Sequence, residues 1–179
     1  MTELACTPGQ TVGPFLGLAL PYPGDSDLVG EGHPQAVRLH GTVYDGAGDA
    51  VPDALVELWQ ADCAGRIPQR AGSLRRDGTA FTGWGRCATD AAGHYGFTTV
   101  APGPGEPGRA PFFAIAVFAR GLLDRLFTRA YLPHDDVNAD PALASLMCVA
   151  ESGGAGYRFD IHLQGPNETV FLAFRDDRR

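Results

Sequence analysis

Glycine and proline interrupt this chain so frequently that only short elements fit between them. The 179 residues include 24 glycines and 14 prolines, which are spread along the chain and separate short apolar runs. Frequent turn residues between short apolar runs are typical of all-β sandwiches and barrels. The chain is therefore predicted to be all-β, and its length suits a single domain with a substantial core.

Several apolar runs have the alternation or the continuous hydrophobicity of strands. Residues 37–44 alternate, with Val37, Leu39 and Val43 on one face, whereas residues 112–119 are almost wholly apolar, as expected of a strand buried on both faces. The predicted strands are residues 37–44, 54–60, 94–100, 112–119, 126–132, 157–163 and 169–174. Together they predict a two-sheet β-sandwich over residues 37–174.

One short helix and an N-terminal arm complete the predicted domain. Asp140 is a suitable N-cap, and Pro141 a suitable first residue, for a helix that continues to Val149. Residues 1–36 carry few strand signals, yet they include apolar side chains such as Phe15. Because a disordered tail, which is the alternative, would carry fewer of these side chains, we predict an ordered arm that packs on a partner chain.

The charge and the chain ends limit the choice of partners. The formal net charge is 14 − 21 = −7, and every cation is an arginine, so no basic face for nucleic acid is expected. No run of about 18 apolar residues is present, which argues against a transmembrane helix. The first residues lack the basic and apolar regions of a secretory signal, so we expect a cytoplasmic location.

The cysteines are expected to be free, buried thiols. Cys6, Cys63, Cys87 and Cys148 form no Cys-x-x-Cys pair, and their long, irregular spacing argues against a zinc site. A reducing compartment would also keep them from forming disulfides.

Taken alone, the residues do not complete any catalytic set. No serine lies in a Gly-x-Ser-x-Gly motif, and the glycine-rich segments lack the lysine of a phosphate-binding loop. The five histidines show no metal-binding i, i+2 or i, i+4 spacing. Asp135 and Asp136 are more simply explained as a solvated loop than as a catalytic pair.

A series of motifs, in order along most of the chain, resembles the intradiol ring-cleaving dioxygenase family. The strand pair at residues 39–43 and 56–62 comes first, followed by Phe-Thr-Gly-Trp-Gly-Arg at 81–86 and Gly-His-Tyr-Gly-Phe at 93–97. Pro-Gly-Pro at 102–104 and residues 157–161 complete the series, so the resemblance spans about residues 7–174. It implies the family's two-sheet sandwich and the cleavage of protocatechuate by O₂ to 3-carboxy-cis,cis-muconate.

The resemblance also shows where this chain departs from the family. Members hold a non-haem ferric ion with two tyrosines and two histidines, which the β chain supplies in enzymes built from related α and β chains. The tyrosine after Pro-Gly-Pro is Gly105 here, and the histidines after the strand proline are Phe113 and Ile115. Residues 45–94 contain no tyrosine, and Ile67 stands where the family usually has an aromatic residue. Ferric ion needs anionic oxygen and imidazole donors, which these residues lack.

These departures imply an α chain without iron. Such a chain would act with a β subunit that carries Fe(III), would be inactive alone, and would assemble with β into larger αβ oligomers. The alternative is a non-enzymatic β-sandwich binding module that has lost the iron site. A homo-oligomeric iron dioxygenase is disfavoured by the missing ligands.

The resemblance further implies that the α chain lines part of the substrate pocket at the α/β boundary. The family's N-terminal segment maps onto Thr11, Gly13 and Pro14, and the arginine of its Thr-Arg-x-Tyr strand maps onto Arg129. A guanidinium suits the carboxylate of protocatechuate in charge and geometry. The alternatives are that Thr11 to Pro14 form only a packed arm and that Arg129 is a structural arginine paired with an acidic neighbour.

Overall fold

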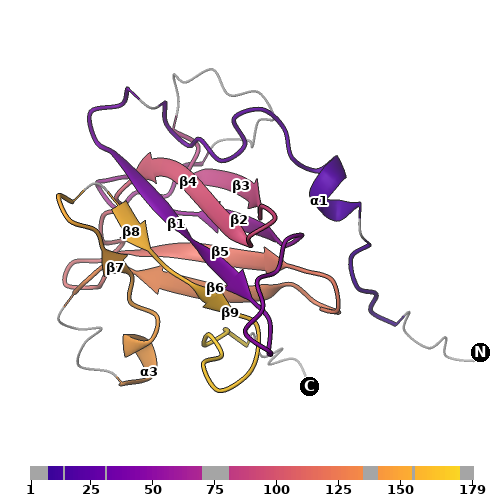
Figure 1. Ribbon diagram of the computed structural model, residues 1–179. Coiled ribbons are helices and arrows are strands. Elements are labelled where there is room, and N and C mark those ends of the chain that lie inside the picture. Colours follow the sequence, from indigo (N-terminus) through magenta and orange to yellow (C-terminus); the bar gives the residue numbers. More distant parts are fainter. Residues whose placement is uncertain are drawn as a thin grey trace, which may run out of the picture.

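Two β-sheets packed face to face form the body of the protein in the computed structural model (Figure 1). The structure describes residues 8–13, 15–30, 32–69, 81–134, 141–154 and 156–173. Among these residues, no helix is long and apolar enough to cross a membrane.

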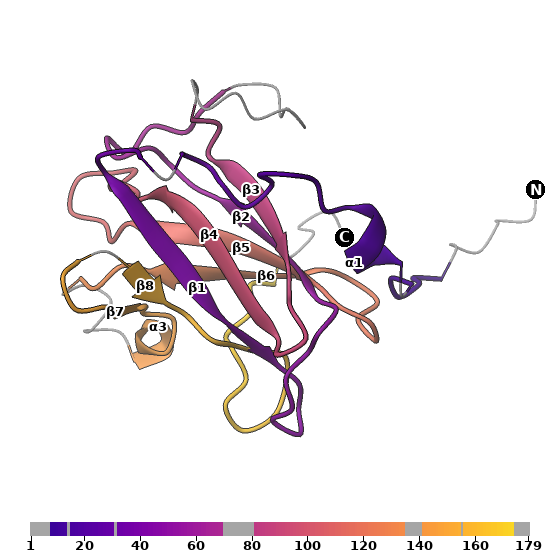
Figure 2. The same ribbon diagram turned by 45° about the horizontal axis from the view of Figure 1, so that its top comes forward.

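The first sheet is built around its longest strand, β1, in the order β4-β1-β8-β7, with β9 also paired to β1 (Figure 2). Strand β1 runs antiparallel to β4 and parallel to β8 and β9. The strands are β1 (Ala36–Tyr44), β4 (His94–Val100), β7 (Val149–Ala150), β8 (Gly156–Arg158) and β9 (Ile161–His162).

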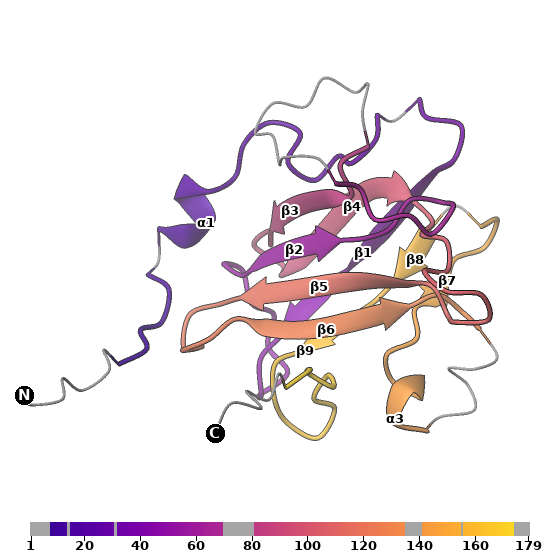
Figure 3. The same cartoon turned by 180° about the vertical axis from the view of Figure 1, so that it is seen from behind.

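The second sheet is fully antiparallel, in the order β3-β2-β5-β6 (Figure 3). Its strands are β2 (Leu55–Trp59), β3 (Trp84–Ala88), β5 (Phe112–Phe118) and β6 (Leu126–Tyr131). The two sheets confirm the all-β sandwich expected from the turn-rich sequence.

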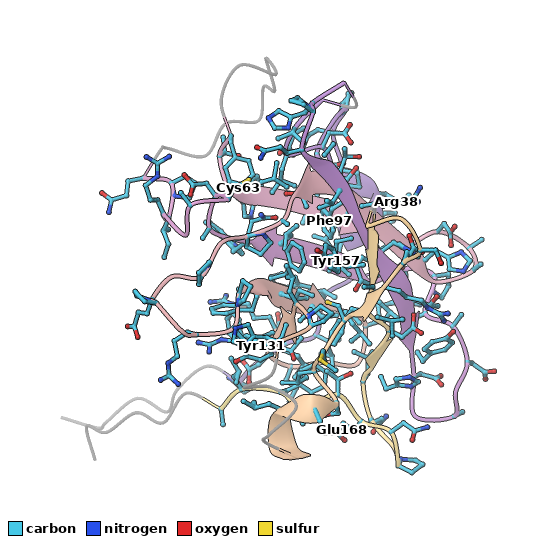
Figure 4. All side chains as sticks on the ribbon, turned by 90° about the vertical axis from the view of Figure 1, so that its left-hand side faces the viewer. Arg38, Cys63, Phe97, Tyr131, Tyr157 and Glu168 are labelled. Atoms are coloured by element: carbon cyan, nitrogen blue, oxygen red, sulfur yellow. The ribbon has the colours of Figure 1, made fainter. Side chains whose placement is uncertain are left out.

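The core lies between the sheets and is almost entirely apolar. Leu39 and Phe97 come from the first sheet and meet Leu58, Phe113 and Ile115 from the second. Figure 4 shows Phe97 and Tyr157 in the middle of the sandwich, and the rings of Tyr157 and Phe113 lie 6.0 Å apart between centroids. Burial of these side chains supplies most of the driving force for folding.

The strand predicted at residues 157–163 is divided into β8 and β9. The division falls at Phe159 and Asp160, because the Oδ1 atom of Asp160 accepts a hydrogen bond from the Thr42 backbone N–H at 3.0 Å. A side chain thus replaces one backbone partner of β1. The same place is crowded, since a Cβ atom on Gly41 would overlap the carbonyl oxygen of Phe159.

Two other elements are shorter than the sequence predicts. The helix begins at Pro141 as expected, but α3 ends at Ala144 (Pro141–Ala144), because the chain then extends and enters β7. The strand predicted at residues 169–174 is absent from the described part, residues 169–173. There the backbone N–H of Leu172 bonds to the Phe127 carbonyl at 2.7 Å, so the tail crosses to the second sheet without forming a ladder.

The N-terminal arm contains a short helix, α1 (Leu16–Ala19), which projects from the sandwich (Figure 1). Phe15 and Leu18 beside and within this helix are exposed. The end of the arm, in contrast, is part of the sandwich. Leu28 is buried and its backbone N–H donates to the Thr98 carbonyl at 2.8 Å. Gly85 of β3 makes room for Leu28, because a Cβ atom at that position would collide with the leucine.

Candidate functional site

The outer face of the second sheet concentrates aromatic side chains and arginines. Residues paired directly across neighbouring strands point to the same face of a sheet. Trp59 pairs with Trp84 on one side and with Ala114 on the other. Ala114 in turn pairs with Arg129, and Phe112 with Tyr131. Aromatic residues and arginines are the types enriched at binding surfaces.

Arg129, the predicted substrate-pocket arginine, is held in place on this face. Its guanidinium carbon lies 4.3 Å from the centroid of the Phe112 ring, and Nη1 donates a hydrogen bond to the Tyr131 hydroxyl at 3.2 Å. Figure 4 shows Tyr131 where β6 ends, toward the loops. The side chain is half-buried, and the described ion pairs include none to Arg129. The ring contact and the hydrogen bond together hold the guanidinium in one orientation.

The arm residues of the predicted pocket lie at the other end of the same sheet. The Thr11 hydroxyl accepts a hydrogen bond from the Gly121 backbone N–H at 2.7 Å, in the turn between β5 and β6. Gly121 lies three residues beyond the end of β5, whereas Arg129 pairs with Ala114 near the start of that strand. Gly13 has no neighbour within 4 Å of a Cβ position, and Pro14 lies outside the described residues. Within this chain, therefore, the two predicted pocket residues Thr11 and Arg129 do not lie together.

An apolar cavity of about 270 Å³ opens beside Arg129 at the edge of this face. It lies where β2 ends and β5 begins, and the loops at residues 60–68 and 103–111 enclose it. Its principal walls are Trp59, Ile67, Trp84, Gly105, Phe112 and Ala114. The two tryptophan rings are tilted against each other with centroids 5.8 Å apart.

Hydrogen bonds fix the loop that carries Ile67. The Oδ1 atom of Asp62 accepts from the backbone N–H groups of Ala64 and Arg66 at 2.9 and 3.0 Å. The bond from the Arg66 N–H is the main reason that the pKa of this carboxyl lies below its usual value. Below the loop, the Gln60 amide donates to the Val100 carbonyl at 2.9 Å and accepts from the Thr99 hydroxyl at 2.6 Å, which ties the end of β2 to the first sheet.

The structure separates the predicted replacements of the iron ligands into two groups. Gly105 borders the cavity, whereas Phe113 and Ile115 are 0% and 2% exposed and face the core. Successive side chains of a strand point to opposite faces, so Phe112 and Ala114 are the residues of β5 that share the cavity with Gly105. Ile67, where the family usually has an aromatic residue, borders it too.

The residues around the cavity do not fit a ferric ion. Isoleucine, glycine, phenylalanine and alanine offer neither the anionic oxygen nor the imidazole that such an ion requires. In the part of the chain that the structure describes, no group of three or more histidine, cysteine, aspartate or glutamate side chains is placed to bind a metal. This chain therefore cannot supply the donor set from these positions.

Comparison with known proteins places the sandwich in a family. A family model described as a dioxygenase matches residues 24–165, most of the chain. The α chain of protocatechuate 3,4-dioxygenase from Burkholderia cepacia is 36% identical over 197 aligned residues, which cover 96% of this chain and 99% of the relative. The chain belongs to the intradiol dioxygenase family.

Two further matches extend this assignment. The β chain of protocatechuate 3,4-dioxygenase from Burkholderia cepacia is 34% identical over 178 aligned residues. The alignment covers 82% of the present chain and 74% of the β chain. Among solved structures, the dioxygenase domain of a dioxygenase–carbohydrate-binding protein fusion from Streptomyces sp. SirexAA-E superposes with a TM-score of 0.60. It is 28% identical and covers 89% of this chain and 98% of that one. Intradiol dioxygenases are non-haem iron enzymes, whereas Gly105, Phe113 and Ile115 of this chain offer no donor to iron.

Proposed function

We propose that this chain is the α subunit of a protocatechuate 3,4-dioxygenase and binds no iron itself. The observation that carries the proposal is the similarity to an α chain over nearly the full length of both proteins. The residues at the family's ligand positions support the same role, because Gly105, Phe113 and Ile115 offer no donor to a ferric ion.

The proposed partner is a β subunit that holds Fe(III). The two chains together would form the pocket in which O₂ cleaves protocatechuate to 3-carboxy-cis,cis-muconate, and αβ units would assemble further. Iron supplies the activation of the ring in such enzymes. The present chain contributes side chains that bind and orient the acid. Free thiols at Cys63, Cys87 and Cys148 support a reducing, cytoplasmic compartment as part of this proposal.

The residue proposed to recognise the substrate is Arg129. Its guanidinium is pre-oriented by Phe112 and Tyr131, which lowers the entropy lost when it binds a carboxylate. The exposed arm, with Phe15 and Leu18, is proposed to pack on β. Because Thr11 and Arg129 lie toward opposite ends of the second sheet, the arm and the arginine are proposed to contact different parts of the partner assembly.

The test is the kinetics of Arg129→Ala in the copurified α/β complex, compared with Arg125→Ala. Arg125 is the matched control because its guanidinium carbon also lies over a phenylalanine ring, at 4.9 Å from the centroid of Phe127 toward the other end of β6. Loss of a hydrogen bond to a charged group costs about 1.5–3 kcal/mol, so KM for protocatechuate should rise roughly 10- to 150-fold in Arg129→Ala.

Catechol, which lacks the carboxylate, separates recognition from structural damage. Its KM should be similar in the wild-type enzyme and in Arg129→Ala. An Arg129→Ala complex with an unchanged KM for protocatechuate would show that the arginine is structural. A chain that never copurifies with an iron-containing partner would favour the non-enzymatic binding module instead.

A further inference from the structure

The cavity has the walls of a ligand site, although no ligand has been assigned to it. Trp59, Trp84 and Phe112 supply aromatic faces, and Ile67 and Pro68 supply aliphatic ones. We propose that it binds a small, uncharged aromatic molecule with one or two rings. This site is separate from the carboxylate site proposed for Arg129, which does not line the cavity, so the inference goes beyond the proposed function.

The size of the cavity suits such a ligand. Its volume of about 270 Å³ exceeds that of an apolar cavity of roughly 150 Å³ that is known to stay dry and bind benzene. It lies just below the roughly 300 Å³ at which pockets for larger ligands begin. The tilted tryptophan pair offers the edge and face contacts that aromatic rings prefer.

Two polar side chains and two backbone N–H groups along the walls are already engaged within the protein. The Gln60 amide is bonded to Thr99, Val100 and Ala61, and the Thr82 hydroxyl donates to the Trp84 carbonyl at 3.3 Å. The N–H groups of Gly65 and Gly103 both donate to the Asp62 carbonyl.

Among the residues that the structure describes, none that lines the cavity is ionisable. An anionic aromatic acid would lose its hydration without gaining a charged partner from these walls, whereas a neutral ring would lose little hydration.

The ligand can enter from solvent in the isolated chain. Trp59 is 55% exposed and Ile67 is 77% exposed, so both stand at the mouth rather than inside the core. Gly105 widens the cavity, because nothing lies within 4 Å of a Cβ position there. An apolar mouth of this kind leaves the cavity ready to accept a ring without rearrangement of the sheet.

Both tryptophans of the protein line the cavity, so their fluorescence reports directly on binding. The purified full chain is titrated with toluene and, separately, with benzoate, with excitation at the red edge of the tryptophan band, where toluene does not absorb. We expect a saturable change with toluene and at least tenfold weaker binding of benzoate. No saturable response to toluene, or equal affinity for both compounds, would overturn the proposal.

Two variants locate the site. Ala114→Leu fills the cavity from β5 and should weaken toluene binding at least tenfold, whereas Ala150→Leu, on exposed β7 of the other sheet, should leave it unchanged. Ile67→Ser, at the exposed mouth, gives a second test with little risk to folding and should weaken binding severalfold. Unchanged affinity in both cavity variants would place the ligand elsewhere and refute the assignment.

Calorimetry with the copurified α/β complex distinguishes a ligand site from a docking pocket. The proposal predicts that toluene still binds in the complex with similar affinity. Loss of binding on assembly would mean that a side chain of the partner occupies the cavity, and the ligand-site assignment would then be wrong.

Discussion

Phe113→Ala tests whether β5 supplies the centre of the core, as its buried inner face indicates. Phe113 is 0% exposed, and its ring packs beside Tyr157 across the sandwich. A phenylalanine buries about 150–250 Å², which at about 25 cal/mol per Å² gives an upper limit near 4–6 kcal/mol for its transfer from water. Alanine retains part of this surface and the neighbours close part of the hole, so we expect a loss of about 3–5 kcal/mol in the free energy of unfolding.

The assay is urea unfolding of the isolated chain followed by tryptophan fluorescence, with Phe15→Ala as the matched control. Phe15 is 73% exposed beside α1, so the same substitution there should change stability by less than about 0.5 kcal/mol. The reasoning is refuted if Phe113→Ala costs less than about 1 kcal/mol, or if the two variants lose similar amounts.

Two further predictions concern single residues. Gly41→Ala should lower the free energy of unfolding by about 1–3 kcal/mol or more, because its Cβ atom would overlap the Phe159 carbonyl oxygen. In the control Gly13→Ala the Cβ atom meets nothing within 4 Å, so the melting temperature should not change. Equal melting shifts in the two variants would contradict this. In a Cys6→Ser variant at mildly alkaline pH, a thiol reagent should modify the exposed Cys63 but not Cys148. The reason is that burial raises the pKa of the Cys148 thiol to about 12, so little reactive thiolate forms. Rapid labelling of Cys148 in the folded protein would count against its burial.

The sequence predicted the strands whose apolar pattern is continuous or strictly alternating. Strands β1, β4, β5 and β6 appear within one or two residues of the predicted ranges. Strand β3 escaped prediction because Trp84-Gly85-Arg86-Cys87-Ala88 has no apolar alternation. Its Gly85 faces Leu28 from the arm, a contact between segments far apart in the chain.

The residues around the cavity could be found only in part from the sequence. The motif resemblance identified Gly105 as a ligand position without its tyrosine and Ile67 as a position without the family's usual aromatic residue, but the choice between Phe112 and Phe113 depends on which face of β5 turns inward. That orientation is set by pairing with β2 and β6, which local sequence does not reveal. Cys63 shows the same limit: it was expected to be buried, but its loop exposes it.

The central claim is that this chain acts as an iron-free subunit beside an iron-bearing partner. The most direct test is to purify the chain alone and after coexpression with a β-type chain, and to measure iron content and protocatechuate cleavage in both samples. We expect the isolated chain to contain no stoichiometric iron and to be inactive, and the complex to contain iron equimolar with its αβ pairs and to cleave the substrate. Stoichiometric iron and activity in the isolated chain, or a complex without either, would contradict the account.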